Sequence, residues 1–174
     1  NGTVNLFIAD GNSDSSSILT PRESSITFSE EREVELRTFD SLQLETVDFA
    51  VIDTQGYEIE VLKGFNEKIY DLNFAIVEFA NYEGYMKQPK YKEIKKFMKK
   101  KGFIVVDQIK KIDSPFPSIK KGSYGDALFV SSEYLSKSQK VKYSILSIFL
   151  NNVFTDLYIY TLEKLKKIIK KLLR

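Results

Sequence analysis

The chain has 174 residues, 43% of them hydrophobic and 29% charged, with a net charge of +2, which is typical of one soluble globular domain. Cysteine and histidine do not occur in it, which excludes disulfides, thiolate nucleophiles, histidine bases and the metal sites that these residues build. Any proton transfer must therefore depend on Asp, Glu, Lys or Tyr.

The first residues lack the basic and apolar segments of a signal peptide, and no apolar run reaches the ~20 residues that span a bilayer. We therefore expect a cytoplasmic protein, with contact to the inner face of the membrane as an open alternative. Because the sequence starts at Asn1 rather than at Met, we also expect it to be a fragment of a longer chain.

The first part of the chain is expected to hold two extended segments. Apolar residues alternate with other residues in 3–10, which predicts a strand. Residues 11–17 are rich in Gly and Ser and are expected to form a loop. Within 33–42, a second extended segment leads into a short helix that Thr38 or Asp40 caps.

Strands and helices alternate from residue 47 onward. The continuous apolar run at 47–54 is typical of a strand buried on both faces of a parallel sheet. Apolar residues follow at helical spacing in 57–72, where Gly64 marks a helix end or a close contact. The remaining expected elements are a strand at 73–80, a helix at 89–103 that stops at Gly102, and strands at 103–109 and 126–131.

This order predicts an α/β fold with a mostly parallel sheet, because strand, helix, strand is the pattern of a parallel crossover unit. Only a loop separates the last two strands, so they are expected to form a terminal antiparallel hairpin. We assign 1–135 to this domain and 136–174 to an amphipathic helical tail.

Charge is unevenly distributed along the chain. Residues 1–85 hold 17 acidic and 5 basic residues, and residues 86–174 hold 7 and 21. Such an excess of lysine indicates either an anionic partner or a solvated helix face. A nucleic-acid-binding domain without catalysis is one alternative, although 38–173 contain no arginine. Membrane-surface contact through 143–174 is another, beside packing on the domain or on another subunit.

Acidic residues stand where the expected strands end. Ligands of open α/β sheets bind outside the carboxyl ends of the strands, and Asp53 and Glu78 follow two such ends. Gly56 would let a ligand approach the backbone. Glu58 is either a functional carboxylate or only a favourable helix-start residue. Asp53 could likewise cap that helix, whereas a partly buried Glu78 needs a partner or a raised pKa.

The segment at 47–64, "VDFAVIDTQGYEIEVLKG", resembles the motif D-F-x-x-I-D-x-Q-G-x-E-x-x-V-L-x-G of the FkbM family of S-adenosylmethionine-dependent methyltransferases. Shorter similarities keep the family's order and extend the resemblance over roughly 1–132. Ala50 and Thr54 are mild departures from the family pattern. The matching residues are Asp48, Phe49, Ile52, Asp53, Gln55, Gly56, Glu58, Val61, Leu62 and Gly64.

The resemblance implies a Rossmann-like class I methyltransferase domain. Such enzymes hold the cofactor over a glycine-rich loop after the first strand, but no G-x-G occurs in this sequence. The resemblance therefore implies that the N-terminal strands are missing here. The chain would be the C-terminal part of the domain and would bind the cofactor poorly by itself.

The resemblance also implies transfer of a methyl group to a hydroxyl of a sugar, glycan or other polyhydroxylated metabolite. We expect Asp53 and Glu58 to be catalytic, since the acceptor hydroxyl must be positioned and must lose a proton. No metal is required, although Asp53, Glu58 and Glu78 could hold magnesium. Cofactor contacts are expected from Asp53, Gln55 and Gly56, and acceptor contacts from Glu78, Tyr85, Ser16 and Ser17, with Ser15 beside them.

Overall fold

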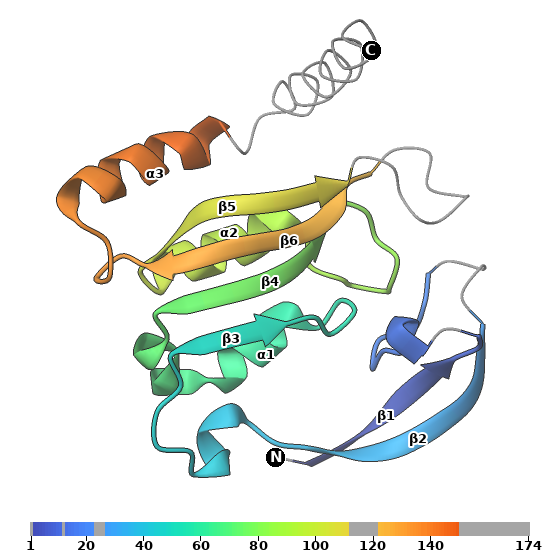
Figure 1. The fold of residues 1–174 in the computed structure, drawn as a ribbon. Helices are drawn as coiled ribbons and strands as arrows, with labels where there is room; N and C mark the ends of the chain where they lie inside the picture. Colours follow the sequence, from blue (N-terminus) through green and yellow to red (C-terminus); the bar gives the residue numbers. More distant parts are fainter. Residues whose placement is uncertain (1, 12, 23–26, 112–121, 150–174) are drawn as a thin grey trace, which may run out of the picture.

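The computed structural model describes residues 2–11, 13–22, 27–111 and 122–149. Within them lie a two-stranded sheet and a four-stranded mixed sheet, so the fold is of the α/β kind (Figure 1). Two helices, α1 (Glu58–Gly64) and α2 (Tyr91–Lys100), lie behind the larger sheet in this view, and the smaller sheet lies beside it.

The smaller sheet is a long antiparallel ribbon. Strand β1 (Gly2–Ala9) pairs with β2 (Phe28–Leu36), and the short helix η1 (Ser13–Ser15) lies between them in the sequence. The predicted strand at 3–10 is therefore confirmed. Most β2 side chains are exposed, which explains why its apolar pattern was too weak to show its full length.

The larger sheet has the strand order β3-β4-β6-β5. Strand β3 (Phe49–Ile52) is parallel to β4 (Phe74–Ala80), and β6 (Tyr124–Ser131) is antiparallel to both β4 and β5 (Phe103–Lys111). The predicted antiparallel pair β5 and β6 is confirmed. Because β6 lies between β4 and β5, however, only one of the three strand contacts is parallel, so the sheet is mixed rather than mostly parallel.

Helices α1 and α2 cover one face of this sheet and bury the core. The predicted helix at 57–72 is divided into α1 (Glu58–Gly64) and η3 (Asn66–Asp71), because Asn66 has a left-handed φ of 49°. Helix α2 (Tyr91–Lys100) follows β4, and η2 (Phe39–Leu42) precedes β3. The core includes Leu62, Ile69, Val77, Phe79, Ile94, Met98 and Phe129.

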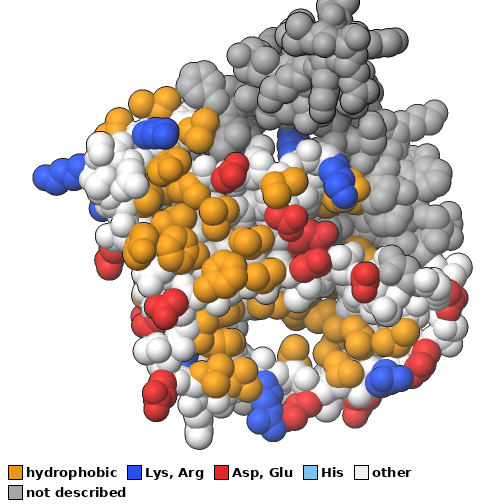
Figure 2. Space-filling view, viewed as in Figure 1, with side chains coloured by type: hydrophobic (Ala, Val, Ile, Leu, Met, Phe, Trp, Pro, Cys, Tyr) orange, Lys and Arg blue, Asp and Glu red, His pale blue; other side chains and the backbone are white. Residues whose placement is uncertain are grey.

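The opposite face of the sheet carries exposed apolar side chains. Phe49 is 49% exposed and Val51 65%, so the expectation that 47–54 is buried on both faces was wrong. Strand β3 is an edge strand, and α1 and α2 lie on the other face. Figure 2 shows hydrophobic side chains spread over this uncovered face, with acidic side chains gathered toward the carboxyl ends of β3 and β4.

The expected helical tail begins with α3 (Lys137–Phe149), which contacts β5. The rest of that tail, 150–174, lies outside the described residues, and the division of the chain after 135 stays a prediction. Among the residues described, no helix combines the length and the apolarity that crossing a bilayer requires.

Candidate active site

A tight turn connects β3 to α1 and needs a glycine. Gln55 has a φ of 50° and Gly56 a φ of 101°, both in the left-handed region. A Cβ atom at Gly56 would lie 3.0 Å from Leu19 Cδ1 and 3.2 Å from Gln88 Cγ. A ligand was expected to approach the backbone at Gly56; the groups that come this close to it in the structure are the side chains of Leu19 and Gln88.

Glu58 holds this turn from inside the protein. Its side chain is buried, and Oε1 accepts hydrogen bonds from the Gly56 amide at 2.8 Å and the Thr54 amide at 3.3 Å. Burial raises the pKa of Glu58, while these backbone hydrogen bonds oppose the rise. A carboxylate so enclosed is placed to stabilise the turn, which favours the helix-start interpretation over a catalytic role.

Gln55 brings together two acids, Asp53 directly after β3 and Glu78 inside β4 near its carboxyl end. Its Nε2 donates to Asp53 Oδ1 at 2.9 Å and to Glu78 Oε2 at 3.1 Å. Asp53 is exposed and Glu78 is half-buried. The expectation that the ends of β3 and β4 place these carboxylates together therefore agrees with the geometry, and Asp53 is the one that solvent reaches.

Glu78 holds its proton more tightly than an ordinary carboxyl. Burial raises the pKa of Glu78 to about 8, with further contributions from a hydrogen bond to Asp53 and from the charges of Asp53, Glu58 and Asp126. Asp126 is the cross-strand neighbour of Glu78 on β6. At neutral pH Glu78 therefore keeps most of its proton.

Tyr85 connects the site to the segment that follows β1. Its hydroxyl donates to the Ser15 carbonyl at 2.7 Å and lies 3.3 Å from Gln55 Oε1. Burial, followed by the charge of Glu78, raises the pKa of Tyr85 to about 12, so the hydroxyl stays protonated at neutral pH. Tyr85 is positioned to orient the Gln55 amide.

The serines expected at the ligand site form hydrogen bonds within the protein. Ser17 is buried, and its Oγ donates to the Gln55 carbonyl at 2.9 Å and accepts from the Leu19 amide at 3.0 Å. Ser16 Oγ accepts from the Ala9 amide at 3.1 Å. Both hydroxyls therefore bond within the protein and stabilise the segment beside the turn.

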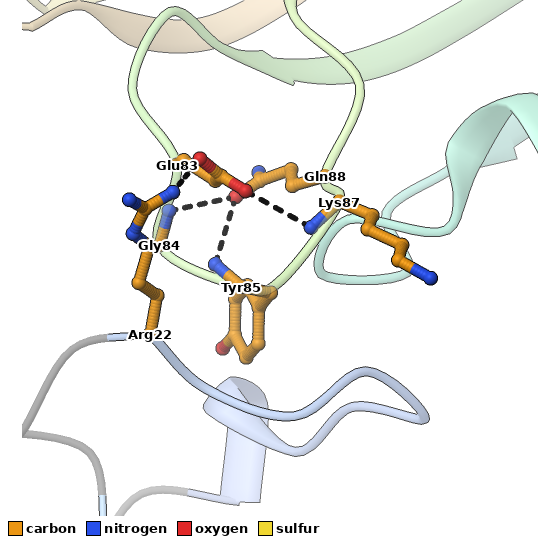
Figure 3. Close-up of polar contacts among 6 residues, drawn as sticks. All are labelled: Arg22, Glu83, Gly84, Tyr85, Lys87 and Gln88. Atoms are coloured by element: carbon orange, nitrogen blue, oxygen red, sulfur yellow. Dashed lines mark hydrogen bonds and ion pairs between the residues drawn. The ribbon is translucent and has the colours of Figure 1, made fainter.

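The loop after β4 is fastened to the segment that contains Arg22 (Figure 3). Arg22 forms an ion pair with Glu83, which also accepts from the Lys87 amide at 3.0 Å. Gln88 Oε1 accepts from the amides of Gly84 and Tyr85 at 3.0 and 3.2 Å. In Figure 3 the Tyr85 ring points toward the η1 segment, while the Lys87 side chain extends to the right, away from Arg22.

A pocket of about 430 Å³ adjoins the turn at Gly56. Its lining combines apolar and aromatic surface with two acidic and two basic residues, and Asp53 is not part of it. A volume of this size suits a small molecule. The lining residues are Leu19, Gly56, Tyr57, Ile59, Glu60, Lys63, Lys87, Pro89 and Glu93.

Two features of this site escape sequence reasoning. Asp126 faces Glu78 only because β6 inserts beside β4, a register that the order of elements does not give. The bridging role of Gln55 depends on its left-handed backbone, for which the following glycine was the sole signal.

Over the described ranges, no three acidic side chains gather closely enough to hold a metal ion.

Comparison with known proteins gives one match. A family model described as the methyltransferase FkbM domain covers residues 2–105, which is more than half of the chain. No match was found among curated proteins or among solved structures. The matched region contains β1 to β4, α1, α2 and every site residue above except Asp126.

Proposed function

The chain belongs to the FkbM methyltransferase family, and from this premise we propose that it takes part in transferring the methyl group of S-adenosylmethionine to a hydroxyl of a polyhydroxylated acceptor. The observation that carries this proposal is the arrangement of Asp53, Gln55 and Glu78. It places an exposed carboxylate, held by an amide and a protonated acid, at the carboxyl ends of two parallel strands.

The residues present fit part of the cofactor. S-adenosylmethionine, when bound, supplies an electrophilic methyl group on a positively charged sulfur. This end of the sheet has a negative potential that favours such a cation. The potential comes from Asp53, which pairs with Glu78, and from Asp126. The described residues contain no glycine-rich loop for the rest of the cofactor, and the edge of β3 has no strand beside it among them. That β3 edge is the place where we expect cofactor-binding strands to pair.

We assign to Asp53 the role of the general base that accepts the proton of the acceptor hydroxyl. Asp53 is exposed at the end of β3, whereas Glu58 is only 2% exposed and occupied by backbone amides. The Gln55 amide donates a hydrogen bond to the Asp53 carboxylate and fixes its direction. A carboxylate held in this way can orient the acceptor hydroxyl and accept its proton as the methyl group is transferred.

The 430 Å³ pocket supports a polyhydroxylated acceptor. Its carboxylates can accept, and its ammonium groups can donate, hydrogen bonds to hydroxyls, and Tyr57 adds an aromatic ring to the lining. Gly56 lines the pocket and follows Gln55 directly. We assign to the pocket the part of the acceptor that is remote from the reacting hydroxyl.

Methyl transfer by the complete gene product tests this proposal. Radiolabelled S-adenosylmethionine is incubated with a panel of sugars and glycans, and label in the acceptor is measured. Asp53→Asn should lower the rate by roughly a hundredfold or more, as loss of a general base does. Asp71→Asn changes an exposed acid at the opposite end of β4 and should leave the rate unchanged. Equal rates for the parent and Asp53→Asn would remove Asp53 from the chemistry.

A further inference from the structure

Helix α3 presents apolar side chains to solvent. Val141 is 61% exposed, Ile145 51% and Leu146 37%. The helix contacts β5, and over 137–146, where side-chain burial is described, the half-buried side chains are Lys140 and Tyr143. Val141 and Ile145 lie on the side of the helix away from these two residues, and Leu146 lies at the border between the two sides. Several exposed large apolar residues on the outward side of one helix are typical of a surface that binds a membrane or another protein.

Lysines flank the exposed apolar residues. Val141 and Ile145 lie one helical turn apart, with Lys137 on one side of them and Lys142 on the other, at about 100° per residue. Both lysines are exposed. A helix that lies in a membrane interface has this arrangement, because the apolar side chains enter the lipid while the lysines reach the headgroups.

Charge decides what kind of partner fits. The sequence has no acidic residue from 134 to 155, and 134–174 hold nine basic residues against two acidic ones. A second copy of this surface would bring like charges together, which disfavours self-association through it. An anionic surface is complementary to it, and each lysine near such a membrane strengthens binding roughly fivefold.

We propose that the outward face of α3, formed by Lys137, Val141, Lys142, Ile145 and Leu146, docks on an anionic lipid surface. The proposal is independent of the chemistry assigned to Asp53. It would hold the methyltransferase at a membrane and so favour acceptors that are attached to or dissolved in lipid.

Flotation with lipid vesicles tests the proposal. The chain is mixed with vesicles of phosphatidylcholine alone or with one-quarter phosphatidylglycerol, at low and high salt. We expect binding to the anionic vesicles only, weakened by salt. Val141→Asn with Ile145→Asn, and separately Lys137→Glu with Lys142→Glu, should each weaken binding roughly tenfold or more. Lys92→Glu with Lys96→Glu on α2 makes the same charge change at exposed lysines and should have little effect.

Three results would overturn this assignment. The first is equal flotation with neutral and anionic vesicles, or no flotation at all. The second is binding that survives both sets of α3 substitutions but is lost when 150–174 are removed. The third is a dimer in sedimentation that Val141→Asn with Ile145→Asn dissociates, since the apolar residues would then be covered by a second copy.

Discussion

Asp53 directly follows β3 and Glu78 lies near the end of the parallel strand β4, and the amide nitrogen of Gln55 joins them, 2.9 Å from Asp53 Oδ1 and 3.1 Å from Glu78 Oε2. The Gln55 NH2 group has two N–H donors and gives one to each carboxyl group. A hydrogen bond to Asp53 and the charge of Asp53 add to the burial that raises the pKa of Glu78, so Glu78 keeps most of its proton at neutral pH. The site is therefore a coupled acid pair rather than two independent side chains.

The first prediction concerns stability and pH. The pKa of Glu78 rises from 4.5 to about 8 on folding, so between these values the folded state holds a proton that the unfolded state releases. The free energy of unfolding should therefore fall as pH rises through this range, by about 1 to 2 kcal/mol after allowance for solvent screening. Glu78→Gln should flatten this slope in urea titrations at pH 5 and 8. The slope that remains should come from Glu58, whose pKa is also raised. An unchanged slope in Glu78→Gln would contradict the prediction.

The second prediction separates a structural Glu58 from a catalytic one. Glu58→Ala leaves the amides of Gly56 and Thr54 without their acceptor in a buried turn, which should lower the free energy of unfolding by about 2 to 3 kcal/mol. Glu58→Gln keeps an oxygen acceptor and should lower it less. The matched control is Glu60→Ala, which removes an exposed ion pair with Lys63 and should change stability by less than about 0.5 kcal/mol. Urea unfolding of the three variants measures this, and a Glu58→Ala protein as stable as the control would rule out the structural role.

The third prediction tests the glycine in the turn. Gly56→Ala places a methyl group against Leu19 and Gln88 and keeps a φ of 101° that alanine adopts poorly. We expect a loss of about 1 to 3 kcal/mol in unfolding free energy. Gly2→Ala is the control, since a Cβ there meets nothing within 4 Å. Adding Leu19→Ala should recover only part of the loss, because it removes the contact but leaves the backbone strain; full recovery would mean that the strain is negligible.

The sequence predicts the parts of this fold that depend on local pattern. Apolar runs and helix signals placed β1, β4, α2 and the β5–β6 pair, and they put Asp53 and Glu78 at neighbouring strand ends. These features follow from the residues of each segment and from the rule that ligands bind at carboxyl ends of strands.

Features that depend on contacts between distant segments could not be predicted in this way. The exposure of Phe49 and Val51 depends on what covers the second face of the sheet, about which an apolar run says nothing. The pairing of Glu78 with Asp126 depends on the place of β6 in the strand order. Likewise, the contacts of Ser17 and Tyr85 with Gln55 join segments 38 and 30 residues apart.

The last prediction examines how Tyr85 connects the η1 segment to the acid pair. Tyr85→Phe keeps the buried ring and removes the hydroxyl that donates to the Ser15 carbonyl, so unfolding free energy should fall by about 1 kcal/mol. The exposed Tyr134→Phe, whose ring packs on Phe74, should have almost no effect.

Hydrogen exchange distinguishes a local change from a global one. The amides of Phe7 and Ser17 bond to each other's carbonyls at 2.9 and 3.1 Å. In Tyr85→Phe these two amides should exchange faster than in the parent, because the η1 segment loses its hydrogen bond to the Tyr85 hydroxyl. The increase should be larger than the loss of global stability alone explains. The side-chain amide of Gln55 would then lose its contact with the Tyr85 hydroxyl, one of the contacts that orient it toward Asp53 and Glu78. If Phe7 and Ser17 exchange as in the parent, the hydroxyl does not hold this segment, and the orientation of Gln55 must come from the two acids alone.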